Sequence, residues 1–399
     1  MKIKLIFFII NCILFCNNKP YLIIVSLDGY RYDYSDMVDT PNLDYIKNNG
    51  VKSKSLKPVF PSLTFPNHYS IATGCYADEH KITGNKFFSK EYNEYYSYKN
   101  SQTVQDGKFY GCEPIWVTAN KNGISSATFF WIGSEAKIKG HRPTIYKEYN
   151  PKISFISRID SAMHWLDLPD EISPQLIMLY FNEPDHSGHI NGPNDVETIN
   201  EVERMDLLMG YLLKEIEKRK NHKNINLIIL SDHGMTNVSE KNIILLDNYI
   251  SKLDQYTIYG AGAFVQLDRK NTLNDFNFNE FNQIPNIQYY ERNNIPNDFH
   301  FHNINSGEML IIADEGYLLG TKENLNDGIF KLKGMHGYNP EFLNMHGIFY
   351  AIGPSFKNNV KVESFENILI YPLVCKLLNM SEYQKSTFFN EIVINNILK

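Results

Sequence analysis

Short runs of consecutive apolar residues alternate along this chain with segments of helical periodicity. Three of the runs are apolar at successive positions and end in polar residues: YLIIVSLDG (21–29), PQLIMLYFN (174–182) and INLIILSDHG (225–234). Such runs are typical of strands buried on both faces of a sheet. Helical patterns occur at residues 40–50 and 193–220. The alternation predicts an α/β fold in which helices cover both faces of a mostly parallel sheet.

The pattern becomes less regular over residues 235–330. Two runs in this part, YTIYGAGAFVQL and EMLIIADEGYLL, have the character of strands in a smaller sheet. No long Gly/Ser or Pro linker separates this part from the rest of the sequence. We therefore predict a single domain over residues 20–399, with a smaller α+β region inserted at about 235–330.

The first residues have the pattern of a targeting segment. Lys2 and Lys4 precede an apolar stretch at 5–16, and polar residues follow at 17–19. This arrangement predicts a secretory signal peptide at residues 1–18, because the apolar stretch is short for a transmembrane helix. An N-terminal membrane anchor and a buried first strand are the alternatives. No later stretch approaches the length of a membrane span, so we expect a secreted or lumenal protein.

Composition narrows the classes of partner. The chain has 399 residues, of which 43% are hydrophobic and 21% charged, as in ordinary globular proteins. Its net charge of −6 gives no basic footprint, so we expect no nucleic-acid polymer as partner. The sequence does not indicate an oligomeric state.

The cysteines limit the disulfides. They occur at positions 12, 16, 75, 112 and 375. Removal of the predicted signal leaves three, which allows at most one internal disulfide and one free thiol and does not say which two pair. Two sequons, beginning at Asn237 and Asn379, permit N-glycosylation on a secretory route.

Aspartates follow the three predicted parallel strands. Asp28 and Asp232 lie at the ends of the first and third strands, and Asp185 follows a few residues after the second. Because sites in such sheets form beyond the carboxyl ends of the strands, we expect the three carboxylates at one edge. Each of them alone could be a simple helix cap.

Histidines complete a set of metal ligands. His189 lies four residues after Asp185, His233 is next to Asp232, and His336 stands in a glycine-containing loop. Imidazole and carboxylate together suit zinc, so the six residues would provide three ligands for each of two metals. His346 is the other late histidine, but it opens an expected strand and could point inward.

Thr64, in FPSLTFPNHYSIATG (60–74), lies at the predicted start of a helix. Two metals can clamp the attacking and leaving oxygens of a phosphoryl displacement, and a metal-bound hydroxyl loses its proton more readily. Backbone N–H groups at the helix start would face a phosphate. The alternative is a capping role for Thr64, and the two readings are compatible.

With these residues, the sequence resembles the nucleotide pyrophosphatase/phosphodiesterase family of the alkaline phosphatase superfamily. The matching strings run in order along nearly the whole chain: SLDGYRYDY (26–34), TPNLDYIKNNGV (40–51), PVFPSLTFPNHYSIATG (58–74), EHKITGN (79–85), EPIWVTA (113–119), YFNEPDHSGH (180–189), SDHGM (231–235), HGYNP (336–340) and FYAIGPSF (349–356). The resemblance implies an alkaline-phosphatase-like sheet between helices and a single catalytic phosphodiesterase domain. We expect the compact type, which consists of the catalytic domain without the additional domains of the larger members.

The resemblance also implies roles for individual residues. Thr64 would be the nucleophile that forms a covalent phosphothreonine intermediate. One zinc would be held by Asp28, Thr64, Asp232 and His233, and the other by Asp185, His189 and His336. Asn85 matches the asparagine whose amide stabilises a phosphate oxygen, a role for which the residues alone gave no signal. Leu63 departs from the family, since some nucleotide-selective members carry a lysine there.

The substrate is the most open part of the prediction. Phe65 matches a residue that stacks on a nucleobase, and Phe129 or Phe130 could supply the opposing face, although strand core is the alternative for both. We expect a small nucleotide diester or pyrophosphate as substrate. A choline phospholipid or lysophospholipid is the alternative, because the same rings could contact its tail or attract choline. A monoester phosphatase and a catalytically silent secreted binding protein are further rivals.

Overall fold

The computed structural model describes residues 19–271, 275–384 and 390–399. The predicted signal peptide at 1–18 lies outside these residues. An eight-stranded sheet forms the centre of the molecule, in the order β19-β2-β18-β9-β1-β8-β6-β7. Its members are β1 (Tyr21–Leu27), β2 (Val51–Ser53), β6 (Ser126–Phe129), β7 (Ile145–Lys147), β8 (Leu176–Phe181), β9 (Ile225–Leu230), β18 (Phe349–Ile352) and β19 (Val360–Val362).

The sheet is mostly parallel, as the sequence predicts. Strand β1 pairs in parallel with both β8 and β9, and β18 is antiparallel to its two neighbours. All residues of β1, β8 and β9 are buried. Such strands need helices on both faces, because an exposed face would leave apolar side chains in water.

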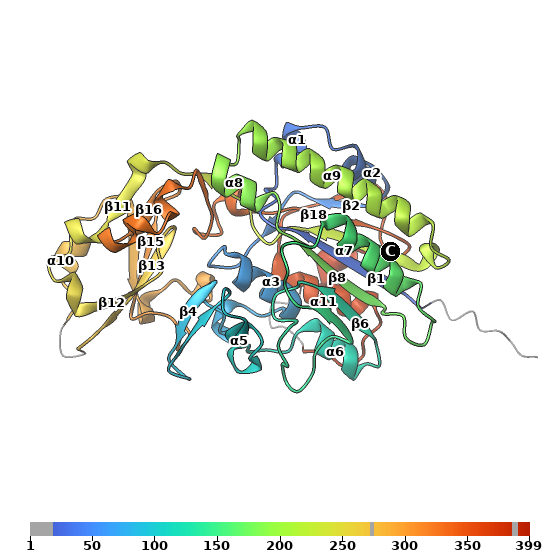
Figure 1. Cartoon of the computed structure of the whole chain (residues 1–399), viewed down its shortest axis with the longest axis horizontal. Helices are drawn as coiled ribbons and strands as arrows, with labels where there is room; N and C mark the ends of the chain where they lie inside the picture. Colours follow the sequence, from blue (N-terminus) through green and yellow to red (C-terminus); the bar gives the residue numbers. More distant parts are fainter. Residues whose placement is uncertain (1–18, 272–274, 385–389) are drawn as a thin grey trace, which may run out of the picture.

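Helices cover both faces of the central sheet (Figure 1). One face packs against α2 (Pro41–Asn49), α7 (Phe155–Leu166) and α9 (Val196–Glu217), and the other against α3 (Thr64–Thr73), α6 (Ile115–Lys121) and α11 (Ile370–Leu377). Helix α2 occupies the predicted segment, with Thr40 at the N-cap and Gly50 at the C-cap. The carboxylate of Asp206, on α9, accepts hydrogen bonds from the first amides of α2. The two helices are therefore fixed to one another.

Between β9 and β18 the chain builds a smaller sheet, at the left of Figure 1. Its antiparallel order is β12-β13-β15-β14, with bounds Tyr256–Tyr259, Phe264–Arg269, Met309–Ala313 and Ile287–Glu291. The parallel pair of β11 (Ile243–Leu245) and β16 (Leu318–Gly320) lies beside it. These strands share their own hydrophobic cluster. We call the chain between β9 and β18 the insertion.

The remaining elements are short. They include α1 (Tyr34–Met37), α4 (Ala77–His80), α5 (Ser101–Val104), α8 (Asp185–Asn191), α10 (Phe278–Phe281) and α12 (Glu391–Ile397). The short strands are β3 (Leu56–Lys57), β4 (Lys86–Ser89), β5 (Glu94–Ser97), β10 (Thr236–Asn237), β17 (Gly334–Met335) and β20 (Phe365–Glu366). None of the helices in the described ranges has the length and apolarity to cross a membrane.

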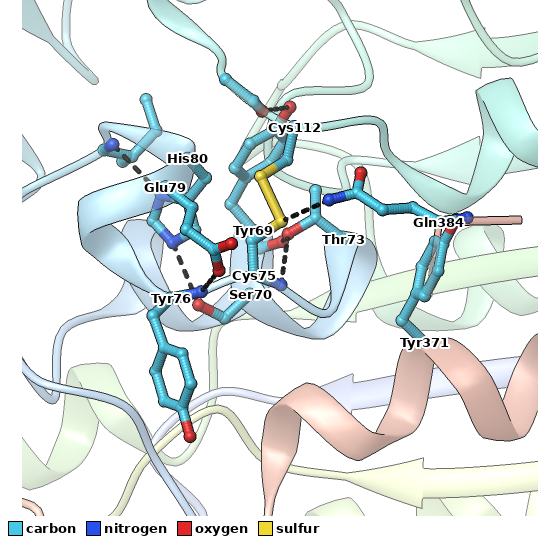
Figure 2. Close-up of a disulfide and its surroundings, with 12 residues drawn as sticks. Tyr69, Ser70, Thr73, Cys75, Tyr76, Glu79, His80, Cys112, Tyr371 and Gln384 are labelled. Carbon is cyan, nitrogen blue, oxygen red and sulfur yellow. Dashed lines mark hydrogen bonds between the residues drawn. A yellow bond between two sulfur atoms is a disulfide. The ribbon is translucent and has the colours of Figure 1, made fainter. Parts of the chain in front are cut away.

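One disulfide joins Cys75 to Cys112, and Cys375 is a buried free thiol. Figure 2 shows that this bond connects the chain just after α3 with the loop that leads to α6. Helix α3 ends at Gly74, whose φ of +68° suits glycine. The C-terminal end of the helix that begins with Thr64 is thereby held covalently.

Candidate active site

Three aspartates meet where neighbouring parallel strands end. Asp28 directly follows β1, Asp185 opens α8 after β8, and Asp232 lies just beyond β9. The amide N of Asp185 donates to the carbonyl O of Asp28 at 3.0 Å, and the amide N of Gly29 donates to Oδ1 of Asp232 at 3.2 Å. A Cβ on Gly29 would lie 2.8 Å from Cα of Asp185, so this close approach requires glycine. The backbone at the sheet edge thus sets the spacing of the carboxylates.

Three histidines present the same ring nitrogen to these carboxylates. His189 lies one helical turn after Asp185 on α8, His233 follows Asp232, and His336 follows β17. Each Nδ1 lies 2.8 Å from a backbone carbonyl, of Gly334, Gly234 and Ser62 respectively. Only a protonated Nδ1 can donate to a carbonyl, so each Nε2 is left with a lone pair. The tautomers are those of metal-ligating histidines.

The lone pairs and carboxylate oxygens face one another at short range. Nε2 of His189 and Nε2 of His336 are 3.1 Å apart, and each lies 3.5 Å from Oδ1 of Asp185. Nε2 of His233 lies 3.4 Å from Oδ1 of Asp28 and 3.1 Å from Oδ2 of Asp232. Each of these three carboxylate oxygens is buried and has no hydrogen-bond donor within the described residues. Such electron-rich atoms need a cation between them.

The electrostatics of the ligand cluster agree with that requirement. Burial, together with the nearby carboxylates of Asp232 and Asp185, raises the pKa of Asp28 well above its ordinary value. Burial, with His233 and His189 nearby, lowers the pKa of His336. Two overlapping sets of side chains have the spacing to hold a metal ion: Asp185, His189 and His336, and Asp28, Asp185 and His233. The donors are nitrogen and oxygen atoms, which suit zinc and similar divalent ions.

Thr64 is the first residue of α3, and its side chain is not used for capping. Leu63 occupies the N-cap position, and no side-chain cap bond forms there. Asn67 instead bonds the preceding backbone, accepting from the amide of Val59 and donating to the carbonyl of Leu63. Oγ1 of Thr64 lies 3.3 Å from Nε2 of His233. The hydroxyl is therefore directed at the ligand cluster.

Asn85 lies beside Thr64 although it is far from it in sequence. Its Oδ1 accepts a hydrogen bond from the amide of Phe65 at 3.0 Å. This bond fixes the orientation of the carboxamide, and no hydrogen bond within the described parts of the chain occupies its NH₂ group, which can therefore face a ligand. Asn85 lines the cavity that contains Thr64. In the sequence, only the resemblance to the family singled it out.

That cavity has a volume of about 570 Å³, and we call it the nucleophile-side cavity. Its walls carry Phe65, Tyr98, Lys99, Phe130, Glu135 and Tyr149. The Phe129 side chain, in contrast, is buried against Phe130 and Trp165 and does not line the cavity. The expectation of a substrate contact from Phe129 is corrected here, since the end of β6 turns Phe129 into the core and Phe130 toward the cavity.

Two buried residues that the sequence reasoning missed support the ligands. Tyr180, on β8, donates from its hydroxyl to Oδ2 of Asp28 at 2.5 Å. His68, on α3, lies between Ser26 and the carbonyl of Thr64, with Nδ1 3.2 Å from Oδ2 of Asp232. Both occur in strings that carry the resemblance, but their types gave no separate signal. They connect the strand ends to the helix of Thr64.

His346, the rejected alternative to His336, has a different environment. Its Nδ1 bonds Oγ of Ser55 at 2.7 Å, and its Nε2 bonds the carbonyl of Pro340 at 2.9 Å. Both ring nitrogens are therefore occupied by the protein itself. Of the two late histidines, His336 is the one that lies in the ligand cluster.

The fold and this cluster are those of a known family. The family model described as type I phosphodiesterase / nucleotide pyrophosphatase matches residues 22–339, so the chain belongs to this family. The members of the family depend on metal ions, as the Asp/His cluster of this chain also suggests.

Curated relatives share the sequence over most of the chain. A venom phosphodiesterase from Naja atra is 35% identical over 372 residues, which cover 90% of this chain and 44% of the relative. The human ectonucleotide pyrophosphatase/phosphodiesterase family member 1 is 36% identical over 374 residues, covering 91% of this chain and 40% of the relative. The chain thus spans less than half the length of these relatives.

Solved structures share the fold. The murine ectonucleotide pyrophosphatase/phosphodiesterase 5, an inactive variant in complex with AMP, superposes with a TM-score of 0.89 at 32% identity. The match covers 96% of this chain and 100% of the murine chain. The human protein of the same name superposes with a TM-score of 0.87. The alkaline-phosphatase-like fold expected from the sequence is therefore confirmed.

Proposed function

We propose that this protein is a phosphodiesterase and nucleotide pyrophosphatase that holds two zinc ions and hydrolyses nucleotide substrates through a covalent phosphothreonine intermediate. The observation that carries the proposal is the position of the Thr64 hydroxyl, 3.3 Å from Nε2 of His233 and beside three unpartnered carboxylate oxygens. A hydroxyl directed at a cation-binding cluster is placed to attack phosphorus, whereas a binding protein has no use for it.

The chain's residues divide the metal-binding and catalytic roles. Asp28, Asp232 and His233 would hold one zinc with Thr64, and Asp185, His189 and His336 the other. Bound zinc supplies Lewis acidity toward the phosphate and favours loss of the nucleophile's proton. Oγ1 of Thr64 attacks phosphorus, the bond to the leaving oxygen breaks, and water then cleaves the Thr64–phosphate bond. The NH₂ of Asn85 and the backbone amide of Thr64 would stabilise a non-bridging oxygen throughout.

Nucleotide substrates are supported by the nucleophile-side cavity. Phe65 lines it with a half-buried ring and Tyr149 with an exposed one, and stacking on such a ring is worth about 1–3 kcal/mol per base. Lys99 also lines this cavity and disfavours a choline cation while attracting phosphate. In the murine relative described above, the bound molecule is AMP. We therefore place a nucleoside against this aromatic wall and its phosphate at Thr64.

We also propose that the protein is secreted or lumenal. The Cys75–Cys112 disulfide is typical of an oxidising compartment. Both sequon asparagines, Asn237 and Asn379, are exposed, so glycosylation would meet no steric obstacle there. The relatives named above include venom and ecto-enzymes.

The test is a comparison of Thr64→Ala with Thr144→Ala, an exposed threonine outside the cluster. With nitrophenyl thymidylate as substrate, Thr64→Ala should abolish turnover and retain the wild-type zinc content by mass spectrometry. Thr144→Ala should retain both. Acid quenching of the wild type during turnover should leave thymidylate attached through its phosphorus to the peptide that contains Thr64.

Near-normal turnover by Thr64→Ala would refute the mechanism. Faster hydrolysis of nitrophenyl phosphorylcholine than of the nucleotide ester would instead assign the same mechanism to choline lipids. Faster hydrolysis of plain nitrophenyl phosphate would indicate a monoester phosphatase.

A further inference from the structure

A second cavity, of about 880 Å³, opens on the other side of the ligand cluster, between the β4–β5 hairpin and the insertion. We call it the insertion-side cavity; its walls include Lys86, Lys99, Tyr259, Gln266 and Asn324. The two cavities share five residues: Asn85, Tyr98, Lys99, His189 and His336. A molecule bound at the cluster can therefore extend into both.

The placement of the ligand residues gives the two cavities different roles. Thr64 and Asp28 line only the nucleophile-side cavity, whereas His189 and His336 line both. In a displacement at phosphorus the attacking and leaving oxygens lie roughly in line, on opposite sides of the phosphorus atom. If Thr64 attacks from its own side, the leaving oxygen departs on the side of His189 and His336. The cavity beyond them is the insertion-side cavity.

The walls of the insertion-side cavity include two lysines, Lys86 and Lys99. Lys86 directly follows Asn85 as the first residue of β4, and Nζ of Lys99 lies over the ring of Tyr98. Neither lysine forms an ion pair with a carboxylate of the described residues. Alternation along β4 puts Lys86 on the same face as Phe88, whose ring stacks on Tyr259 of the insertion. Lys86 is therefore on the face of the hairpin that is turned toward the insertion. Asp327, the acidic residue in this wall, accepts a hydrogen bond from Asn324.

We propose that the insertion-side cavity binds the leaving group of the hydrolysed bond and that Lys86 and Lys99 bind the phosphate of that group. The inference rests on the proposed function and goes further by naming the cavity and the residues that bind the leaving group. Ligand pockets commonly measure about 300–1,000 Å³, so the cavity has room for diphosphate and for a nucleoside beyond it. A choline leaving group would meet two lysines there and would be disfavoured.

The experiment compares two ligands that differ only in the part assigned to this cavity. In a Thr64→Ala background, which removes turnover, the Kd values of AMP and ATP are measured by calorimetry at fixed zinc. AMP occupies the nucleophile-side cavity alone, and ATP adds a diphosphate. Adding Lys86→Met should weaken ATP binding about fivefold to tenfold and AMP binding far less, because one charged contact to phosphate is lost. Lys86→Arg should restore most of the affinity for ATP.

The control is Lys361→Met, which removes the same charge from the exposed edge strand β19 and should leave both Kd values unchanged. In the active enzyme, Lys86→Met should lower kcat/KM for ATP several times more than for nitrophenyl thymidylate, whose leaving group has no phosphate. Equal effects on both members of either pair would overturn the inference while leaving the phosphodiesterase intact. Failure of the wild type to hydrolyse either substrate would overturn the proposed function and the inference together.

Discussion

Individual side chains at the strand ends determine whether the cluster binds metal. Oδ1 of Asp185 lies 3.5 Å from Nε2 of both His189 and His336, and it has no donor in the described part of the chain. We predict that Asp185→Ala loses about one zinc per chain together with turnover, because two neutral imidazoles remain without a carboxylate.

Glu183→Ala is the matched control, since its carboxylate accepts from the amide of Ser187 and lies outside the ligand groups. Zinc content measured by mass spectrometry, with circular dichroism as a check of folding, separates the two variants. Full zinc occupancy in Asp185→Ala would contradict the ligand assignment.

Because of His80, the free energy of unfolding decreases as the pH falls. Its Nδ1 accepts from the amide of Ile82, and its Nε2 bonds Oγ of Ser70 (Figure 2). Burial lowers the pKa of His80 from its ordinary value of 6.5 to about 3. Because the unfolded chain binds this proton first, His80 contributes stability that is present above about pH 6.5 and lost as the pH falls toward 3. The loss is roughly 2–3 kcal/mol by about pH 4.5.

We therefore predict that His80→Gln is less stable than wild type at pH 8 but loses less stability between pH 7 and 4.5. Urea unfolding at several pH values measures the unfolding free energy of both proteins. Zinc-free protein is used so that pH-dependent zinc binding by the ligand histidines does not contribute. His164→Gln, at an exposed position on α7, should keep the wild-type slope. An unchanged slope in His80→Gln would show that His80 does not cause the acid sensitivity.

At this scale the sequence predicts some residues well and others not at all. The strand-end rule selects Asp28, Asp185 and Asp232, because their positions follow from local pattern. Position relative to a strand does not identify Tyr180 or His68, because their roles depend on contacts between β8, α3 and the strand ends. The choice between Phe129 and Phe130 stays open in the sequence for another reason: at a strand end, adjacent residues face opposite ways, and the pattern does not say which faces the cavity.

Among the elements, α3 is secured at both ends. Its first residue faces the ligand cluster, and the residue after its C-cap, Cys75, is bonded to Cys112 across a sequence separation of 37. We predict that the double variant Cys75→Ala/Cys112→Ala loses about 3–4 kcal/mol of unfolding free energy, because the unfolded chain regains the entropy of that loop. Turnover should persist at low temperature, since neither sulfur lines either cavity.

A comparison with and without reductant gives the control. Reductant should lower the Tm of the wild type toward that of the double variant and leave the double variant unchanged. A double variant as stable as the oxidised wild type would contradict the prediction. Helix boundaries such as those of α2 were predictable from Pro41 and Gly50, but the choice among three cysteines was not, because it depends on where loops from different elements meet.

In the whole molecule, one lysine connects the β4–β5 hairpin to the insertion. Nζ of Lys90 donates to Oδ1 of Asp268 at 2.8 Å and to the carbonyl of Ser306 at 2.9 Å. We predict that Lys90→Met loosens this connection, at a cost of about 1–2 kcal/mol. Hydrogen exchange should increase in β12 and β13 before it increases in β1 or β9.

Lys108→Met is the matched control, because its pairs with Glu94 and Asp106 are at the surface, where such pairs contribute little. It should leave exchange in the insertion unchanged. Equal exchange in wild type and Lys90→Met would mean that apolar packing alone holds the insertion in place.

The architecture at this scale was largely predictable, since buried apolar strands alternating with helices specify a parallel sheet. The presence of two cavities was not. Their walls combine Lys86 and Tyr98 from the hairpin with Tyr259 and Asn324 from the insertion, and nothing local in the sequence shows that these segments face each other.

The metal-ligand residues and the cavity walls belong to parts of the fold that differ in burial. Three of the ligands, Asp28, Asp232 and His233, are buried and directly follow strands of the central sheet, where a substitution disturbs the packing of the whole sheet. The cavity walls come from a hairpin and an insertion with exposed side chains such as Lys86 and Lys99, where most substitutions change stability by less than about 0.5 kcal/mol. Substitutions in the cavity walls can therefore change which leaving group is bound, while selection preserves the residues that cleave the bond. We expect substrate preference to diverge among descendants of such a protein much faster than its reaction.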